Sequence, residues 1–500
     1  MRRDDVQRDA RVRRAGHRPS SQRCPDPTET VSSPPPDLVR APSRAARCHL
    51  CTRHADRSVH KWHLAEGRED SGRHIDSTGR GPAGWIPSMS RHVVVVGAGL
   101  FGAATALHLA RGGARVTLVE SGDAARGTTA AGAGFVGLWA AGYAWYWNES
   151  ERDLEQYGLD FYRALAVDPD RGGVDILLRE TGSAWLAVTE EGVRDHLGPL
   201  AEHPLRPEGS RELSPQEAAE LVPGLDANAV TGGFLQPDGI QISAPDAALA
   251  LVAAARAAGV EIVEHAPVTE VLATDGRASG VRTADGRIFS GDSVVLAAGS
   301  WTNELLAPLG RRLPLARVVA SRLTTAPFGL PHLPTLMLPE LGGLWVREHL
   351  GGLTYGNGVG YEPLGESAAD RRPQRTDLVE AMDAHLAPLI AHLIPASADA
   401  LRETEWTQGV VSYTADRRFL AGPVPELPGL FVAAGDNESG VTHGPGLGRL
   451  VAELVLHGRT TLGDAELYAP ARFAARQFPD EAAVRAAMPA RRLVDAVTAR

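Results

Sequence analysis

Three glycines with the spacing G-x-G-x-x-G stand where a buried strand would give way to a helix. They are Gly97, Gly99 and Gly102, preceded by four valines at 93–96 and followed by an alanine-rich run. This spacing allows a tight turn, a close approach of the backbone to a pyrophosphate, and close packing of the helix on the strand. The first turn of the helix would direct free N–H groups and its positive dipole end at the phosphates. The pattern predicts a dinucleotide site.

An acidic residue closes the next predicted strand, as such a site requires. The apolar run 115–119 is followed directly by Glu120 and Ser121. A carboxylate at this place can accept hydrogen bonds from the ribose hydroxyls of an adenosine. Because strand, glycine turn, helix, strand and acid occur in this order, the sequence favours a bound dinucleotide over a glycine-rich turn without a ligand.

Two later segments repeat the pattern of a buried strand that ends in glycine. They are 293–299 and 430–435, and half-polar strands lie between the three units. This arrangement predicts an α/β fold, with a Rossmann-type nucleotide-binding domain built from discontinuous pieces and an inserted α+β substrate domain that contains an antiparallel sheet.

The periodicity and the end signals place the main elements. The strands expected are 92–96, 115–119, 183–188, 260–264 and a meander over 268–290 with Asp-Gly turns at 275–276 and 285–286. The helices expected are 100–112, 150–166, 190–200, 214–221, 245–258, 376–393 and 447–457.

Composition excludes several classes of protein. The 500 residues are 43% hydrophobic with a net charge of −10. The first 88 residues are basic and the remainder is strongly acidic, which argues against a nucleic-acid partner. No apolar run is long enough for a membrane span. The three cysteines, Cys24, Cys48 and Cys51, all precede the glycine turn, which fits a reducing, cytoplasmic setting.

Residues 1–88 are rich in Arg, Pro, Ser and Asp and lack periodicity, so we expect a disordered or wrongly assigned extension, with translation starting at Met89. A zinc site is the less favoured alternative here, because the ligand spacing is short and little apolar sequence could pack around it. Its ligands would be Cys48, Cys51, His60 and His63. No metal is expected elsewhere.

From about 89 to 475 the chain resembles the FAD-dependent amine oxidoreductases of the D-amino-acid oxidase, glycine oxidase and sarcosine oxidase group. The resemblance rests on ordered motifs, namely V-V-G-A-G-L-F-G at 95–102, T-T-A-A-G at 128–132, L-A-A-G-S-W at 296–301, Y-T-A-D-R-R-F-L-A-G-P at 413–423 and the glycine-rich stretch 429–449. It implies a bound FAD and hydride transfer from the carbon beside an amine nitrogen to flavin N5, giving an imine. Oxygen or another acceptor would reoxidise the flavin.

The same resemblance implies which residues contact the cofactor. They are Gly97, Gly99, Leu100, Phe101, Gly102, Glu120 and Ser121 for the AMP half, Thr128, Thr129, Ala298 and Gly299 near the phosphates, Val268 at the adenine, and Gly435, Asp436, Gly440, Val441 and Thr442 around the ribityl chain and the flavin ring. A helix starting at 447 would stabilise the anionic reduced flavin through its dipole.

The chain departs from the family at three places. The arginine that usually clamps a substrate carboxylate is replaced by Val411, so either Arg347 substitutes for it or the substrate is an amine without a carboxylate. The lysine and the flavin-attaching cysteine of sarcosine oxidases have no counterpart, because Lys61 is the single lysine and all three cysteines precede the glycine turn. We therefore expect the FAD to be bound non-covalently. Asp436 stands where histidine is common.

Candidate catalytic residues are Arg347, Tyr413 and His443. Arg347 could equally form a structural ion pair, and His443 is more simply a loop histidine. An aromatic cluster follows the flavin motif, either as a wall over a ligand or as a core or interface patch. It consists of Trp139, Tyr143, Trp145, Tyr146 and Trp147.

The expected domains are an FAD-binding domain, a substrate domain and a helical tail. The FAD-binding domain takes 89–178, 233–310 and 405–475, the substrate domain takes 179–232 and 311–404, and the tail takes 476–500. The leading function is oxidation of an amine or amino acid. The alternatives are a flavin-dependent monooxygenase and a non-catalytic FAD-binding subunit of an amine dehydrogenase complex.

Overall fold

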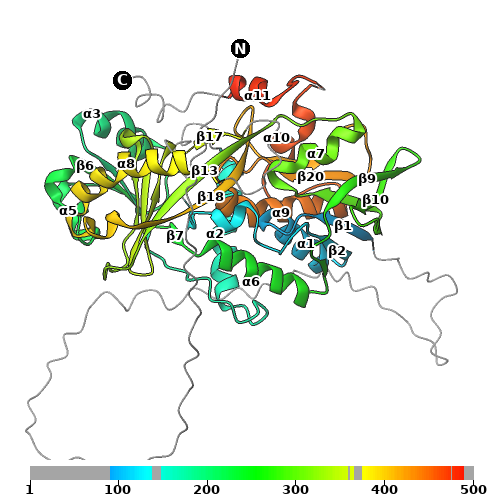
Figure 1. Ribbon diagram of the computed structural model, residues 1–500, viewed down its shortest axis with the longest axis horizontal. Helices are drawn as coiled ribbons and strands as arrows, with labels where there is room; N and C mark the ends of the chain where they lie inside the picture. The colour runs from blue at the N-terminus through cyan, green and yellow to red at the C-terminus, as the bar shows by residue number, and fades with distance from the viewer. Residues whose placement is uncertain (1–90, 138–147, 359–360, 365–373, 475, 489–500) are drawn as a thin grey trace, which may run out of the picture. The chain divides into compact units, whose positions relative to one another are not determined.

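Two large β-sheets dominate the computed structural model (Figure 1). A three-stranded sheet and a two-stranded sheet accompany them. The structure describes residues 91–137, 148–358, 361–364, 374–474 and 476–488. The possible zinc ligands and the aromatic cluster 139–147 lie outside these residues.

The first large sheet has six strands in the order β19-β20-β12-β1-β2-β8. Five are parallel and β19 is antiparallel to β20. Both faces are covered, so its strands are almost continuously apolar. The bounds are β1 (His92–Val96), β2 (Arg115–Val119), β8 (Glu261–Val263), β12 (Ser293–Leu296), β19 (Leu420–Pro423) and β20 (Leu430–Ala434). Because its strands come from distant parts of the chain, the sheet confirms the discontinuous Rossmann-type fold.

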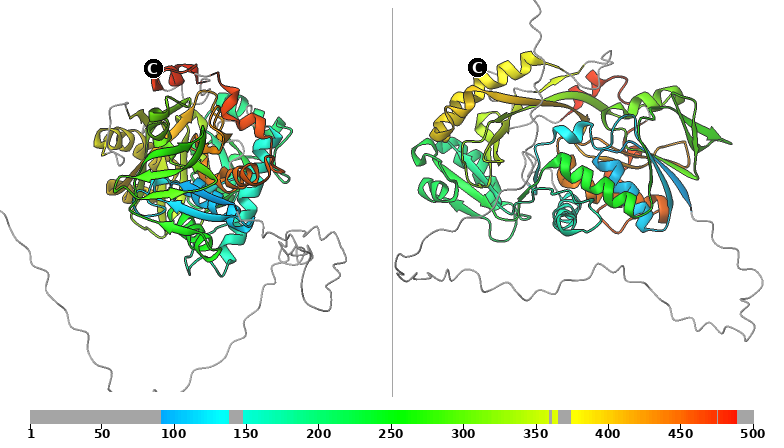
Figure 2. Two further views of the ribbon diagram at one scale, coloured as in Figure 1. Left: turned by 90° about the vertical axis from the view of Figure 1, so that its right-hand side faces the viewer. Right: turned by 60° about the horizontal axis from the view of Figure 1, so that its bottom comes forward.

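Four helices and a meander accompany this sheet. The helices are α1 (Leu100–Arg111), α2 (Glu149–Val167), α6 (Ala244–Ala257) and α9 (Gly440–His457), and they share one apolar core with β1 and β2. Figure 1 shows α1 and α9 beside these two strands. The meander, drawn as a green hairpin in Figure 2, consists of β9 (Val268–Thr274), β10 (Arg277–Thr283) and β11 (Ile288–Ser290).

The second large sheet has nine strands. Eight follow the order β17-β13-β16-β15-β14-β4-β6-β5, and β18 pairs with β13 along its whole length. All pairs are antiparallel except β14 with β4, which confirms the expected antiparallel sheet. The bounds are β4 (Ser183–Ala187), β5 (Arg211–Leu213), β6 (Gly232–Gln236), β13 (Leu315–Thr325), β14 (Thr335–Leu338), β15 (Leu344–His349), β16 (Gly352–Gly356), β17 (Tyr361–Pro363) and β18 (Thr404–Thr414).

The two faces of the nine-stranded sheet have different partners. Side chains alternate between the faces of a strand. Val346 and Tyr355 pack with Met382 of α8 (Thr376–Leu393). Trp345 and Arg347, which flank Val346 on β15, therefore point to the opposite face, and Trp345 belongs to a separate apolar cluster. This second face carries the side chains discussed below.

The helix expected over 447–457 begins earlier, so that prediction was wrong. Helix α9 starts at Gly440 and contains Pro445. Proline has no N–H group, so the carbonyl of Val441 loses its helical partner. The hydroxyl of Tyr162 donates to that carbonyl instead, at 2.8 Å. This outside donor lets the helix continue through the proline.

The other expected elements agree with the structure to within a few residues. The predicted helix 190–200 is a continuous run of α3 (Glu190–Gly192), a π-helical turn η2 (Val193–Leu197) and α4 (Gly198–Glu202). The remaining elements are β3 (Phe135–Val136), β7 (Ile240–Gln241), α5 (Pro215–Leu221), α7 (Thr302–Leu306), α10 (Ala465–Tyr468), α11 (Glu481–Ala487) and 3-10 turns, of which η1 (Thr128–Ala131) and η4 (Gly299–Trp301) matter below. In the described part of the chain, no helix combines the length and the hydropathy of a membrane crossing.

The domain division stays a prediction, and two strands bear on its borders. β6 and β18 both pair within the nine-stranded sheet. The expected division placed 233–310 and 405–475 with the FAD-binding part. Sheet membership therefore favours borders that keep β6 and β18 with the substrate part.

Candidate cofactor and active site

The glycine turn after β1 is held in a conformation that only glycine accommodates easily. Gly97 has a φ of +101°, and a Cβ there would collide with the carbonyl oxygen of Ala297. A Cβ on Gly102 would collide with the carbonyl oxygen of Gly97. A Cβ on Gly99, by contrast, would meet only the hydroxyl of Thr129, at 3.5 Å. Gly99 therefore leaves its space to a cavity of about 1350 Å³.

Glu120 is fixed beside this turn and lines the same cavity. Its Oε2 accepts a hydrogen bond from the Ala98 N–H at 2.7 Å. Its Oε1 accepts from the Ser121 hydroxyl at 2.9 Å and from the Gly122 N–H at 3.0 Å. The carboxylate is thus oriented before any ligand arrives, and further lone pairs stay available for a ribose.

Two helix N-termini meet at the cavity. Gly99, Leu100 and Phe101 of α1 line it, and so do Gly440, Val441 and Thr442 of α9. Within the described residues, neither N-cap makes a side-chain capping bond and neither first turn holds an acidic residue. Free N–H groups and positive dipole ends are therefore directed at one space, which suits an anionic ligand at two points.

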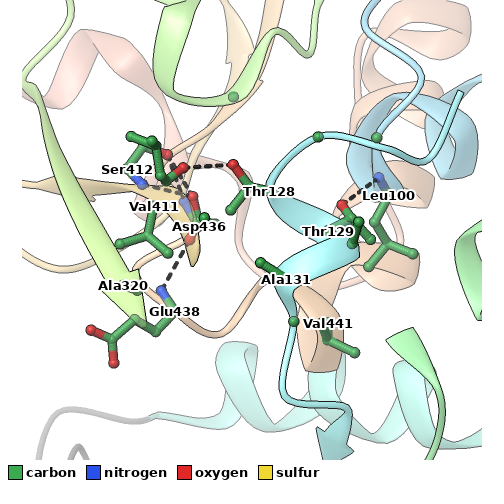
Figure 3. Close-up of a pocket in the computed structure, with 18 of the residues that line it drawn as sticks. Leu100, Thr128, Thr129, Ala131, Ala320, Val411, Ser412, Asp436, Glu438 and Val441 are labelled. Atoms are coloured by element: carbon green, nitrogen blue, oxygen red, sulfur yellow. Dashed lines mark hydrogen bonds between the residues drawn. The ribbon is translucent and has the colours of Figure 1, made fainter. Parts of the chain in front are cut away.

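The two threonines of η1 are both engaged by the protein. The Thr129 hydroxyl accepts from the Leu100 N–H at 3.2 Å, and the Thr128 hydroxyl donates to the Val410 carbonyl at 2.6 Å (Figure 3). The hydroxyl of Ser300 donates to the same carbonyl at 2.7 Å. These bonds tie η1 to α1 on one side and to β18 on the other.

Asp436 lines the cavity, but its carboxylate is turned toward β18. Its Oδ2 accepts from the Ser412 N–H at 2.8 Å and from the Ser412 hydroxyl at 2.7 Å, and its Oδ1 accepts from the Glu438 N–H at 3.1 Å (Figure 3). Burial raises the pKa of this carboxyl above its ordinary value, against the effect of these bonds. The aspartate therefore holds the loop between β20 and α9 in place.

The predicted site residues mostly meet at this one cavity. Those that line it are Gly97, Gly99, Leu100, Phe101, Glu120, Ser121, Thr128, Thr129, Val268, Ala298, Gly299, Asp436, Gly440, Val441, Thr442 and His443. Gly102 and Gly435 lie behind the lining: Gly102 packs on Gly97, and Gly435 has a φ of +73° against Thr414.

The three candidate catalytic residues differ in position. His443 lines the cavity and is buried against Phe419, with ring centres 5.1 Å apart, and burial lowers its pKa to about 4. Tyr413 lies outside the lining, packed with Val411 and under the guanidinium of Arg417. Arg347 also lies outside the lining. Because His443 is neutral at pH 7, it is poorly suited to act as a proton donor there.

The far end of the cavity is formed by the nine-stranded sheet. Trp185, Met337 and Trp345 share an apolar cluster and line this end. Arg322 of β13 also lines it. Sequence reasoning missed Arg322, although an arginine that closely follows the apolar run 318–320 within a β-rich segment is a usable signal.

The residues present fit a dinucleotide with a redox-active ring. The cavity lining combines a glycine cradle with a fixed carboxylate, two helix N-termini, and an apolar, aromatic part on the nine-stranded sheet. Over the described residues no group of His, Cys, Asp or Glu could hold a metal ion.

Residues 92–454 match the model of the DAO family, described as FAD dependent oxidoreductase. The chain belongs to this family of FAD-dependent oxidoreductases, and FAD is its cofactor, as the sequence predicted. It is 33% identical over 391 residues to the glycine oxidase of Pseudomonas aeruginosa, covering 77% of this chain and 99% of that protein.

Longer proteins are similar as well. The chain is 32% identical to the 4-methylaminobutanoate oxidase (formaldehyde-forming) of Paenarthrobacter nicotinovorans and 29% identical to the mitochondrial pyruvate dehydrogenase phosphatase regulatory subunit of Mus musculus. It covers 43% and 44% of these two proteins, and they cover 73% and 78% of this chain. Among solved structures, the glycine oxidase of Geobacillus kaustophilus superposes with a TM-score of 0.66 at 29% identity, covering 77% of this chain and all of that one.

Proposed function

We propose that the protein oxidises the C–N bond of a small amine or amino acid. The observation that carries this proposal is that one continuous cavity is lined both by the glycine turn and Glu120 and by the apolar residues Trp185, Met337 and Trp345. When bound, FAD supplies the hydride acceptor, at N5 of its ring. The substrate loses a hydride from the carbon and a proton from the nitrogen, and water hydrolyses the resulting imine.

The contribution of the chain's own residues is positioning and the exclusion of water. We propose that Gly97, Gly99 and Glu120 hold the AMP half and that the first turn of α9 faces the flavin ring. The apolar cluster then forms a dry wall against which a neutral amine can lie. Two relatives are named glycine oxidase and 4-methylaminobutanoate oxidase, and these names support an amine or amino-acid donor.

The finer properties follow from composition. Residues 89–500 contain no cysteine or lysine, which supports a non-covalent FAD and a reducing, cytoplasmic setting. The acidic body supports a small-molecule substrate rather than a nucleic acid. The electron acceptor is oxygen or another oxidant.

The test is anaerobic bleaching of the flavin in the purified protein. A panel of D- and L-amino acids, N-methyl amines and carboxylate-free amines is mixed with the protein while the visible spectrum is recorded. Bleaching by at least one amine is expected. A protein without flavin absorbance would contradict the proposal, and NADPH consumption with a phenol would indicate a monooxygenase instead.

A second candidate is a non-catalytic FAD-binding subunit. The chain is 29% identical to the pyruvate dehydrogenase phosphatase regulatory subunit, and this similarity favours the second candidate. Under this function the protein retains FAD, yet no amine bleaches it.

A further inference from the structure

A positively charged side chain, Arg322, stands in the apolar end of the cavity. It points from β13 toward η1, where its Nε donates to the Ala131 carbonyl at 3.1 Å. Its Nη1 contacts the hydroxyls of Thr324 and Thr354, each at 3.3 Å. Its Nη2 makes no hydrogen bond with any residue that the structure describes. All of its partners are thus neutral oxygens, and burial lowers its pKa.

A second guanidinium lies close by. Arg347 is 6% exposed and, among the described residues, it has neither a hydrogen bond nor an ion pair. Its Nη2 lies 3.3 Å from the place that a Cβ on Gly134 would take, and Gly134 lines the cavity. Burial, and then the charge of Arg322, lower the pKa of Arg347 to about 10. This value still leaves the guanidinium positive at pH 7.

The register of the strands brings the two arginines to one place. Arg347 of β15 stands opposite Thr354 of β16. Thr354 stands opposite Thr324 of β13, two residues from Arg322. Glu348, the nearest acid in sequence, points to the other face of the sheet, where it binds His332 at 2.8 Å and the Gly351 N–H at 2.6 Å. The half-buried Arg322 and the buried Arg347 therefore share one face without a negative charge between them.

Such an arrangement is costly for a protein unless an anion completes it. A buried charge without a partner is strongly unfavourable, and a nearby like charge adds to the cost. Because Arg322 lines the cavity, an anion that enters the cavity can reach its guanidinium. The position of the family's usual carboxylate-binding arginine, Val411, is apolar and packs with Val318 and Tyr413.

We propose that Arg322 binds the carboxylate of the substrate and that Arg347 raises the positive potential behind it. The substrate is then an amino acid, not a simple amine, and its apolar side chain lies against Trp185, Met337 and Trp345. This assignment rests on the proposed function, since it places the substrate beside the flavin. Arg322 is the anchor, and Arg347 is a positioning residue that acts through charge.

The first test compares an amino acid with the amine that lacks only its carboxylate. Phenylalanine and phenethylamine form one pair, and leucine and 3-methylbutylamine form another. The rate of anaerobic flavin bleaching is measured at several concentrations for the wild type and for Arg322→Met and Arg322→Lys. In Arg322→Met, the concentration of amino acid that gives half the limiting rate of bleaching should rise roughly 30-fold or more, whereas that of the amine should change little. Arg322→Lys should recover part of the loss because it keeps the charge.

Arg347→Met should raise the half-saturating concentration of the amino acid by a smaller factor and leave the limiting rate of bleaching unchanged. The matched control is Arg282→Met, which removes an arginine of β10 that pairs with Glu270 of β9. This variant should change the bleaching kinetics of neither substrate. Equal losses for both members of a pair would overturn the proposal, because Arg322 would then act on the flavin or on the fold. A wild type that prefers the amine would overturn it as well.

A second test needs no turnover and therefore remains informative if the proposed function fails. Phenylacetate and its neutral counterpart phenylacetamide are titrated into the FAD-loaded protein, and binding is followed by the visible flavin spectrum and by the shift in Tm. Phenylacetate should bind to the wild type and to Arg282→Met, but not to Arg322→Met, and phenylacetamide should bind weakly to all three. Equal binding of phenylacetate to the wild type and to Arg322→Met would contradict the proposal.

Discussion

The two ends of the cavity use polar groups in opposite ways. At the cofactor end, Glu120 and Asp436 accept three hydrogen bonds each from neighbouring N–H and hydroxyl groups. At the substrate end, Arg322 is half-buried and Arg347 is buried, and neither has a carboxylate partner among the described residues. The carboxylates of the cofactor end are therefore satisfied within the protein, whereas the arginines of the substrate end gain an ionic partner only when an anionic ligand binds. Substitutions at the two ends should accordingly differ in kind.

The largest effect is expected at Gly102. In Gly102→Val, the new side chain meets the Gly97 carbonyl, so either the helix or the turn must move. We expect a loss of roughly 3 kcal/mol in the free energy of unfolding and almost complete loss of bound FAD. The ratio of flavin to protein absorbance and the Tm measure this. Gly198→Ala, where the nearest atom is a carbonyl at 3.8 Å, is the control and should retain FAD.

The next effect is a dependence of stability on pH at the cofactor end. The folded-state pKa of His443 is about 4, below its ordinary value of 6.5, so the unfolded state binds more protons between these values. Stability is then fully present above pH 6.5 and falls by up to about 3 kcal/mol as the pH falls to 4. His443→Gln should reduce the slope of the free energy of unfolding against pH, measured by urea unfolding at several pH values. His108, whose pKa burial lowers to about 3, retains part of it.

His457, exposed at the end of α9, provides the matched substitution for that experiment. His457→Gln should leave the slope as it is in the wild type. An unchanged slope in His443→Gln would show that the ring is not the group that titrates.

A smaller effect is expected from Glu120. Glu120→Gln keeps the shape of the side chain but removes the charge that would strengthen its bonds to a ribose. We expect the Kd for FAD to rise roughly 10-fold, measured by titrating the apoprotein with FAD and following fluorescence. Glu270→Gln, on the exposed meander, should bind FAD like the wild type. Unaltered affinity in Glu120→Gln would remove this residue from the cofactor site.

The smallest effect concerns the substrate end. Trp345 and Phe135 form part of the apolar wall, with their ring centres 5.3 Å apart. Trp345→Leu removes part of this wall and enlarges the cavity. The ratio of kcat/KM between a bulky and a small substrate should change by up to roughly tenfold. Bound FAD should stay at the wild-type level. Loss of FAD in this variant would mean that the two ends are not separable.

Local patterns were sufficient to predict the cofactor end from the sequence. A strand, a G-x-G-x-x-G turn and a following acid are each fixed by neighbours within about thirty residues, so Gly97, Gly99 and Glu120 could be placed in advance. The start of α9 could not, because the donor that satisfies the Val441 carbonyl is Tyr162, far away in sequence.

The substrate end depended on contacts that no local pattern reports. Arg322 and Arg347 are brought together by pairing across β13, β16 and β15. Sequence reasoning identified Arg347 as a possible substitute for the missing arginine, but it did not identify Arg322, which lines the cavity. Strand register, and not residue type, decides which of the two is reached from the cavity.

One backbone carbonyl limits how this protein can be recombined with its relatives. The oxygen of Val410 receives the hydroxyls of both Thr128 and Ser300, so segments near residues 128, 300 and 410 are joined at one atom. A chimera that brought a residue without a hydroxyl to position 128 or 300 would remove one of the two donors from this carbonyl and loosen the junction. Grafting a new substrate end onto this cofactor end therefore requires β18 to remain with η1 and η4.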